Sequence, residues 1–271
     1  MKGIRVFLMT FGSMWEPKTE WDYQAMGLPA EAAAKLPPEQ QLRQTISYAV
    51  LVDHPDAGWI LFDTGNAPDP AVSWPEHIKK NVPCRVPPEE RMVHQLSLAG
   101  LTPGDIKHVI TSHMHFDHIG NDVLFKDTAD FFVSRLEAEY AYKAVLQTSN
   151  SDEHGWYVRE DVLLPRRKVT YLEKDEELFE GIRVIQLPGH TPGVMGMVVH
   201  AENGTLIFPS DALKFKKHLA DEVPDGLYSI ESFVKSTEKV KFLQEKYNAK
   251  IFYSHDDAEI AGYKKAPLYY E

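Results

Sequence analysis

Short runs of apolar residues, separated by polar and turn-forming residues, recur along the whole chain. Runs of this length that are rich in Val, Ile and Phe are typical of strands buried in a sheet. The pattern predicts strands at Ile4–Met9, Ile46–Val52, Trp59–Phe62, His108–Thr111, Asp130–Val133, Val169–Leu172, Ile182–Leu187, Val194–His200, Thr205–Phe208 and Ile251–Tyr253.

Apolar residues at helical spacing predict helices elsewhere. The candidates are Glu89–Ala99, Ser134–Leu146 and Ser229–Lys246. The last of them repeats its apolar residues at intervals of three and four, so one face is expected to lie against a sheet. Ser134, followed by Glu137 three residues later, has the form of a capping box at the start of its helix.

Strands mixed with helices, and no long linker, predict one domain that spans residues 1–271. Its expected form is two sheets that face each other, with helices outside.

Two segments fit this scheme poorly. Residues 13–43 carry aromatic side chains such as Trp15 and Tyr23 between the first two strands, which predicts an inserted segment that lines a substrate pocket or makes a dimer contact. Residues 147–168 hold Trp156 in an irregular, polar stretch, to which the same interpretation applies more weakly.

Composition narrows the classes of function. With 43 % apolar and 25 % charged residues, the 271-residue chain is typical of a soluble globular protein. No apolar run approaches the roughly 20 residues that span a bilayer, and the N-terminus is a strand candidate rather than a secretory signal, so we expect a cytoplasmic protein without membrane contact. The net charge of −11 disfavours nucleic acid as a partner. The single cysteine, Cys84, excludes an internal disulfide and a cysteine-rich metal site.

The most informative segment is the loop expected after the strand that ends at Thr111. It contains His113, His115, Asp117 and His118 in the pattern His-x-His-x-Asp-His. Such tightly packed imidazoles repel one another when protonated, whereas a divalent cation binds neutral imidazole and carboxylate together. In an extended segment His113 and His115 point to the same side and can reach one ion. Asp117 and His118 follow a turn and can reach a second ion.

Two ions need further ligands, and the later sequence offers them at equivalent places. His190, Asp211 and His255 each follow directly on a predicted strand. Functional side chains collect at such strand ends, because the strand ends meet along one edge of a sheet. Together with the histidine loop, these residues complete two metal sites of nitrogen and oxygen ligands.

On these residues the chain resembles the metallo-β-lactamase superfamily, because Asp63-Thr64-Gly65, the loop from His113 to His118, and His190, Asp211 and His255 occur in the expected order. The resemblance implies an α+β fold, an αββα sandwich with the metals at one edge of two mixed sheets. It also implies that His113, His115 and His190 hold the first ion, that Asp117, His118 and His255 hold the second, and that Asp211 bridges them. Asp63 is expected to support the ligand loop.

Within the superfamily, the chain is similar to the N-acyl homoserine lactone hydrolases, which quench quorum sensing. Those lactonases carry a tyrosine three residues after the bridging aspartate, where this chain has Lys214. In many zinc β-lactamases a lysine in that position binds a substrate carboxylate. Lys214 is therefore expected to stabilise an oxyanion or to hold an anionic group, with Tyr228 and His218 as alternative donors.

The resulting prediction is a dinuclear metal-dependent hydrolase that opens a small lactone or ester by attack of a metal-bridging hydroxide. Asp117 is expected to be both a ligand and a general acid–base group. Zinc is the expected metal, with manganese, iron and cobalt as alternatives. A homodimer is compatible with the sequence. The competing functions are a phosphodiesterase of the same superfamily, acting on an anionic substrate held by Lys214, and a persulfide dioxygenase with one iron.

Overall fold

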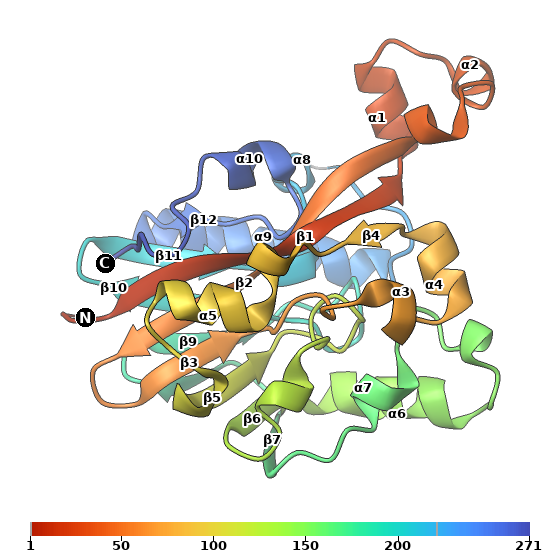
Figure 1. Ribbon diagram of the computed structural model, residues 1–271. Coiled ribbons are helices and arrows are strands. Elements are labelled where there is room, and N and C mark those ends of the chain that lie inside the picture. The colour runs from red at the N-terminus through yellow and green to blue at the C-terminus, as the bar shows by residue number, and fades with distance from the viewer. Residues whose placement is uncertain (1, 221) are drawn as a thin grey trace.

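A computed structural model describes residues 2–220 and 222–271. Its strands form two sheets that pack face to face, with helices on both outer faces (Figure 1). The larger sheet has the order β4-β1-β2-β3-β5-β6-β7 and the smaller one the order β12-β11-β10-β9-β8. The strands are β1 (Arg5–Pro17), β2 (Leu42–His54), β3 (Gly58–Phe62), β4 (Cys84–Arg85), β5 (Ile106–Thr111), β6 (Asp130–Ser134), β7 (Lys168–Leu172), β8 (Glu176–Phe179), β9 (Ile182–Gln186), β10 (Met195–Ala201), β11 (Gly204–Phe208) and β12 (Lys250–Ile251).

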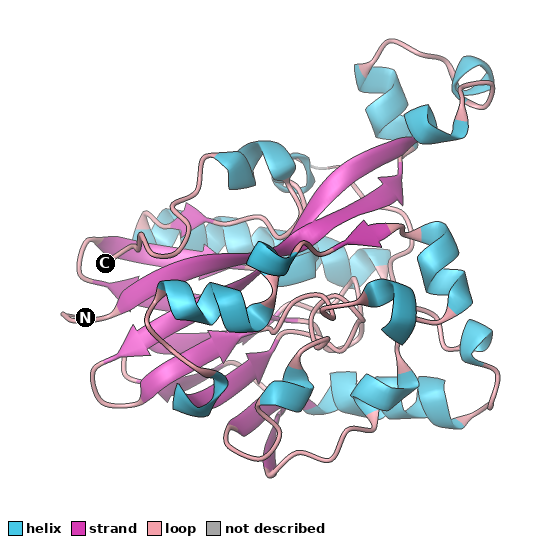
Figure 2. Cartoon of the chain, in the orientation of Figure 1, coloured by secondary structure: helices cyan, strands magenta, loops and turns pink. Residues whose placement is uncertain are grey.

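Helices and single helical turns connect the strands and cover the sheets (Figure 2). The α-helices are α1 (Glu20–Ala25), α2 (Ala30–Ala33), α3 (Pro70–Ser73), α4 (Glu76–Asn81), α5 (Met92–Leu98), α6 (Arg135–Leu146), α7 (Arg159–Val162), α8 (Lys216–Leu219), α9 (Ile230–Tyr247) and α10 (Asp257–Ala261). Turns of 3-10 helix lie at η1 (Pro38–Gln41), η2 (Pro88–Glu90), η3 (Pro103–Asp105), η4 (Asp122–Leu124), η5 (Ser151–Glu153) and η6 (Ser210–Leu213).

Side chains that alternate between the two faces of each strand explain how the sheets and helices pack in layers. On β1, Val6 and Leu8 point into the core between the two sheets, where they meet Val184 and Met197 of the smaller sheet. Phe7 and its alternate neighbours point to the other face of the larger sheet, because successive side chains of a strand lie on opposite faces. Both sheets are mixed, since each contains parallel and antiparallel pairs.

The outer faces are buried by amphipathic helices. Met92 and Leu96 of α5 pack under the larger sheet, while Phe233 and Val240 of α9 pack under the smaller one. The αββα sandwich of two mixed sheets is therefore confirmed. Of the helices in the described part of the chain, none combines the length and the apolar composition that crossing a membrane requires.

The first two strands are much longer than their apolar runs predict. β1 continues to Pro17 and pairs with β2 as far back as Leu42, so the ends of the 13–43 segment form an extended hairpin. The helices α1 and α2 at the tip of this hairpin project beyond the two sheets (Figure 1), and Asp22 of α1 pairs with Lys217 of α8. The apolar pattern stops early because the outer part of the hairpin has no second sheet to pack against.

Two local predictions need correction. The helix expected at Glu89–Ala99 begins as the separate turn η2 and becomes α-helical only at Met92. Ser134 is the N-cap residue of α6, but its side chain makes no capping hydrogen bond, so the capping box is wrong. Glu137 instead points into the protein, where it has a different role.

Candidate metal centre and its two cavities

The predicted ligands lie together at one edge of the sandwich. The loop from His113 to His118 follows β5, His190 follows β9, Asp211 follows β11, and His255 follows β12. Neighbouring strand ends thus deliver side chains from distant parts of the sequence to one place. All of these side chains are buried except that of His190, which is 13 % exposed.

A first group of imidazoles surrounds His115. Its Nδ1 lies 3.1 Å from Nε2 of His113 and 3.1 Å from Nε2 of His190. The three rings pack edge-on against one another, and neutral imidazoles at such distances offer several nitrogen lone pairs to the same point. His113, His115 and His190 together form a group of donor atoms that could hold a metal ion.

A second group lies beside the first and contains Asp117, His118 and His255. Nε2 of His118 and Nε2 of His255 each lie 3.5 Å from Oδ2 of Asp117. Asp211 stands between the two groups. Its Oδ1 lies 3.3 Å from Nε2 of His118 and 3.0 Å from Nε2 of His255, while its Oδ2 lies 3.4 Å from Nε2 of His190.

Buried partners fix the orientation of this second group. Nδ1 of His118 donates to Oδ2 of Asp63 at 2.8 Å, and Asp63 also accepts from the backbone and the hydroxyl of Ser112. Nδ1 of His255 donates to the carbonyl of Ile46 at 3.2 Å. A proton on Nδ1 leaves Nε2 as a lone pair, so both rings present an acceptor nitrogen to the centre.

Those nitrogens give a direct test of whether a cation fits. Nε2 of His118 and Nε2 of His255 are buried and make no hydrogen bond, although carboxylate oxygens lie close by. Buried polar atoms are rarely left without a partner. Imidazole nitrogens and carboxylate oxygens that converge in this way fit divalent metal ions, for which they are the usual ligands.

Burial and charge set the protonation of the centre. Burial, reinforced by neighbouring imidazoles, holds the pKa of His113 and that of His115 well below the ordinary value. Burial likewise lowers the pKa of His190 to about 4. Burial also acts on His118, but the carboxylates of Asp117, Asp211 and Asp63 outweigh it and raise its pKa. The first group is therefore neutral at pH 7, and positive charge is favoured beside the aspartates.

Glu137 ties the centre to α6. Its Oε1 accepts from the backbone of Met114 at 3.0 Å and from the hydroxyl of Tyr157 at 3.1 Å. Tyr157 in turn packs edge-on against His115, with ring centroids 4.8 Å apart. Gly193, which follows the His190 turn, also donates its backbone N–H to Glu137. This carboxylate thus links both histidine loops, a role that its spacing from Ser134 conceals in the sequence.

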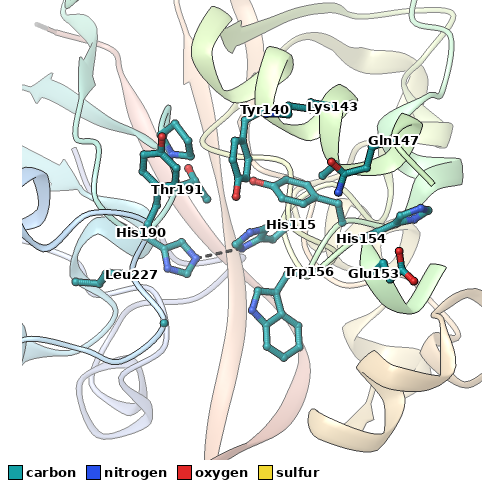
Figure 3. Close-up of a pocket in the computed structure, with 16 residues that line it drawn as sticks. His115, Tyr140, Lys143, Gln147, Glu153, His154, Trp156, His190, Thr191 and Leu227 are labelled. Atoms are coloured by element: carbon teal, nitrogen blue, oxygen red, sulfur yellow. Dashed lines mark hydrogen bonds between the residues drawn. The ribbon is translucent and has the colours of Figure 1, made fainter. Parts of the chain in front are cut away.

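Two cavities open onto the centre. One of about 420 Å³ is lined by aromatic side chains that include Tyr140, Trp156 and Tyr157 (Figure 3). The other, of about 500 Å³, reaches Asp117, Asp211 and Lys214 together with residues of the hairpin base. His115, Trp156, His190 and Gly226 border both, and Figure 3 shows His115 and His190 meeting at the centre of the view.

The two unusual segments contribute differently from what their aromatic residues predict. The hairpin supplies Glu16, Pro17, Lys18, Thr19 and Arg43 to the larger cavity. Within the described residues, Trp15 and Tyr23 line neither of these cavities. Trp156, from residues 147–168, lines both of them. Residues 147–168, for which the sequence supports a role in a pocket more weakly, thus contribute to the aromatic wall.

The three side chains predicted as hydrogen-bond donors to the substrate lie in different cavities. Lys214 lines the larger cavity with its Nζ 3.6 Å from Oδ2 of Asp211, and His218 is buried in the same wall. Tyr228 lines the smaller cavity, where its ring is 59 % exposed and packs edge-on against Tyr140. The sequence gives no sign that Glu16 pairs with Lys214, at 3.2 Å, because 198 positions separate them.

Comparison with known proteins supports the assignment that the site suggests. Residues 42–255 match the sequence profile of the metallo-beta-lactamase superfamily. An N-acyl homoserine lactonase of a Bacillus species is 30 % identical over 220 residues, which cover 79 % of this chain and 83 % of that protein. The N-acyl homoserine lactonase AttM of Agrobacterium fabrum is 31 % identical, over 81 % of this chain and 85 % of its own length.

Solved structures agree on the fold. A crystal structure of an AiiA variant from Bacillus thuringiensis, with N-decanoyl-L-homoserine at its active site, superposes with a TM-score of 0.80 at 23 % identity and covers 100 % of both chains. A quorum-quenching N-acyl homoserine lactone lactonase superposes with a TM-score of 0.77 at 25 % identity, over 100 % of this chain and 99 % of that one. The chain therefore belongs to the metallo-beta-lactamase superfamily, and its curated relatives group it with the N-acyl homoserine lactonases.

Proposed function

We propose that this protein is a metal-dependent hydrolase that opens the ring of N-acyl homoserine lactones. The observation that carries the proposal is the set of seven side chains, six of them buried, whose donor atoms converge at the mouth of two cavities. Curated relatives with about 30 % identity over most of the chain carry the name of this activity. One cavity with an aromatic wall and one with polar residues near Asp211 suit a substrate that joins an acyl chain to a polar ring.

The ligand roles follow from the two groups. His113, His115 and His190 would hold one divalent ion, and Asp117, His118 and His255 a second. Asp211 would contact both, because its two oxygens face different groups. When bound, the ions would supply Lewis acidity and an activated water. We propose zinc, because nitrogen and oxygen donors suit it, with manganese, iron or cobalt as alternatives.

The protein's own groups then position the ring and move protons. Asp117 lines the larger cavity, so its carboxylate can take up a proton and return it to the ring oxygen that leaves. The ammonium of Lys214 is close enough to the same space to donate to the substrate carbonyl. An ammonium has three N–H donors, and the hydrogen bond to Glu16 uses one of them, while Asp211 lies at ion-pair distance, 3.6 Å away. Asp63 holds the tautomer of His118 on which the second group depends.

The other candidate donors have weaker support. Tyr228 lines the opposite cavity, where it can contact the acyl part of a substrate. His218 is in the wall near Lys214, but burial lowers its pKa to about 3, so it can act only as a neutral group. Lys214 is therefore our first choice for the residue that replaces the lactonase tyrosine.

A substrate panel tests the proposal. The metal-loaded protein is offered an N-acyl homoserine lactone, an aryl ester and a phosphodiester, and acid release is followed by pH. We expect the lactone to be opened at least about tenfold faster than the ester, and Asp211→Ala to abolish turnover in a protein that remains folded. Cleavage of the phosphodiester with an inert lactone would overturn the proposal in favour of a phosphodiesterase.

Three further predictions from the sequence accompany this function. The hairpin of residues 13–43 is proposed as the insertion that shapes the substrate pocket of a single domain, because its base lines the larger cavity. Its exposed tip is the proposed site of a homodimer contact. A cytoplasmic location stays a prediction.

A further inference from the structure

The wall of the larger cavity contains an ion pair between distant elements. Oε1 of Glu16, near the end of β1, lies 3.2 Å from Nζ of Lys214, and both side chains are mostly buried, at 15 % and 18 % exposure. The same ammonium lies 3.6 Å from Oδ2 of Asp211. Lys214 therefore meets two carboxylates before any substrate enters.

The neighbouring cations also have partners, which are carboxylates for Arg43 and a backbone carbonyl for Lys18. Arg43 donates from Nη1 to Oδ2 of Asp22 at 2.8 Å, and its Nη2 lies 3.5 Å from Oε2 of Glu16. The guanidinium also lies over the ring of Phe215, 4.1 Å from its centroid. Lys18, the other cation that lines this cavity, donates to the carbonyl of Gln40.

Paired charges select against an anionic ligand. A carboxylate or phosphate that approached Lys214 would have to displace Glu16 or lie beside it, and two like charges in a mostly buried space repel strongly. A neutral carbonyl meets no such repulsion and can still accept a hydrogen bond from the free N–H of Lys214. Specificity of this kind arises from a repulsive element built against the wrong ligand.

We propose that Glu16 is a specificity-determining residue that reserves this cavity for uncharged substrates by pairing with Lys214. The inference rests on the proposed function, because it takes the larger cavity to be the place where the reacting group binds. It names the substrate class as a neutral lactone or ester, and it excludes anionic substrates held by Lys214. The charge selection comes from the hairpin, since Glu16 and Arg43 belong to β1 and β2.

Direct binding of a simple anion tests the pairing without relying on turnover. Hexanoate is titrated calorimetrically into the metal-loaded wild type and into Glu16→Gln, which keeps the side-chain shape and removes the charge. We expect hexanoate to bind about tenfold more tightly to Glu16→Gln, a gain of about 1.4 kcal/mol. The gain should disappear when Lys214→Met is added, because the released cation is then absent.

Two further variants complete the design. Glu259→Gln removes the partner of Lys216, a pair outside the cavity with an Nζ–Oε1 distance of 2.7 Å, and should leave hexanoate affinity within twofold of wild type. Glu16→Ala removes the same charge with a smaller side chain and should give a similar gain in hexanoate affinity, so the proposal stays testable if Glu16→Gln fails to fold.

The outcomes separate this inference from the function on which it rests. Equal hexanoate affinity in wild type and Glu16→Gln, or a gain that survives Lys214→Met, would overturn the role of Glu16. Failure of every lactone in the panel would overturn the proposed activity, while the binding measurements would still report on the ion pair.

Discussion

At the scale of single residues, the centre depends on side chains that hold other side chains. Asp63 has a positive φ of 63°, a conformation that L-residues other than glycine seldom adopt. From this position it accepts from the backbone of Ser112 and from Nδ1 of His118. The strained backbone is thus used to aim one carboxylate at the start of the histidine loop and at one of its rings.

Alanine substitutions at two neighbouring lysines, Lys214 and Lys216, test the proposed donor role of Lys214. Lys214→Ala should lower kcat/KM for the lactone by about 10- to 100-fold, because it removes a donor that faces the reacting carbonyl. Lys216→Ala should change it less than about twofold, since Lys216 is mostly exposed and pairs with Glu259 outside the cavity. Steady-state kinetics on the two variants measure the difference, and equal losses would show that Lys214 has no special part in turnover.

At the scale of secondary-structure elements, the loops at the strand ends are fastened to the helices beside them. Glu137, in the first turn of α6, holds the His113 loop through Met114 and the following segment through Tyr157. Gly193 fits so closely against α6 that a Cβ there would lie 2.3 Å from the backbone nitrogen of Glu137. The helix and the two loops therefore form one packed unit beneath the metal ligands.

The short helix α7 carries a pH-dependent group. Burial, aided by the charge of Asp122, raises the pKa of Asp161 from 3.8 to about 7. The folded protein then binds a proton that the unfolded chain releases, so stability is present below about pH 4 and is lost as pH rises through 7. Asp161→Asn should remove this loss and increase the free energy of unfolding at pH 8 by about 1–3 kcal/mol.

Urea unfolding at pH 5 and pH 8 measures this effect. The exposed neighbour in Glu160→Gln serves as the control and should change the difference between the two pH values only slightly, because the charge of Glu160 is the weakest of the influences that raise the pKa of Asp161. A wild-type stability that is equal at both pH values, or that falls toward pH 8 as much in Asp161→Asn as in wild type, would contradict this role of Asp161.

At the scale of the whole molecule, the sequence predicts whatever depends on local pattern and on motif order. Most strands from β3 onward follow apolar runs, and the ligand residues lie at strand ends; β4 and β8 are the exceptions, because the apolar pattern predicts no strand there. Contacts between distant segments leave no such pattern. The pairing of Glu16 with Lys214 and the link from Glu137 to Met114 depend on the folded sandwich. The length of β1 beyond Met9 also escapes prediction, because its outer half is not covered by the second sheet.

The central claim is that seven side chains hold two divalent ions. Elemental analysis of the purified protein tests it most directly, combined with lactone hydrolysis before and after chelation. We expect about two transition-metal ions per chain, loss of turnover on chelation, and recovery when zinc is returned. One iron per chain would indicate the dioxygenase class instead, and a protein without bound metal whose turnover resists chelators would contradict the account.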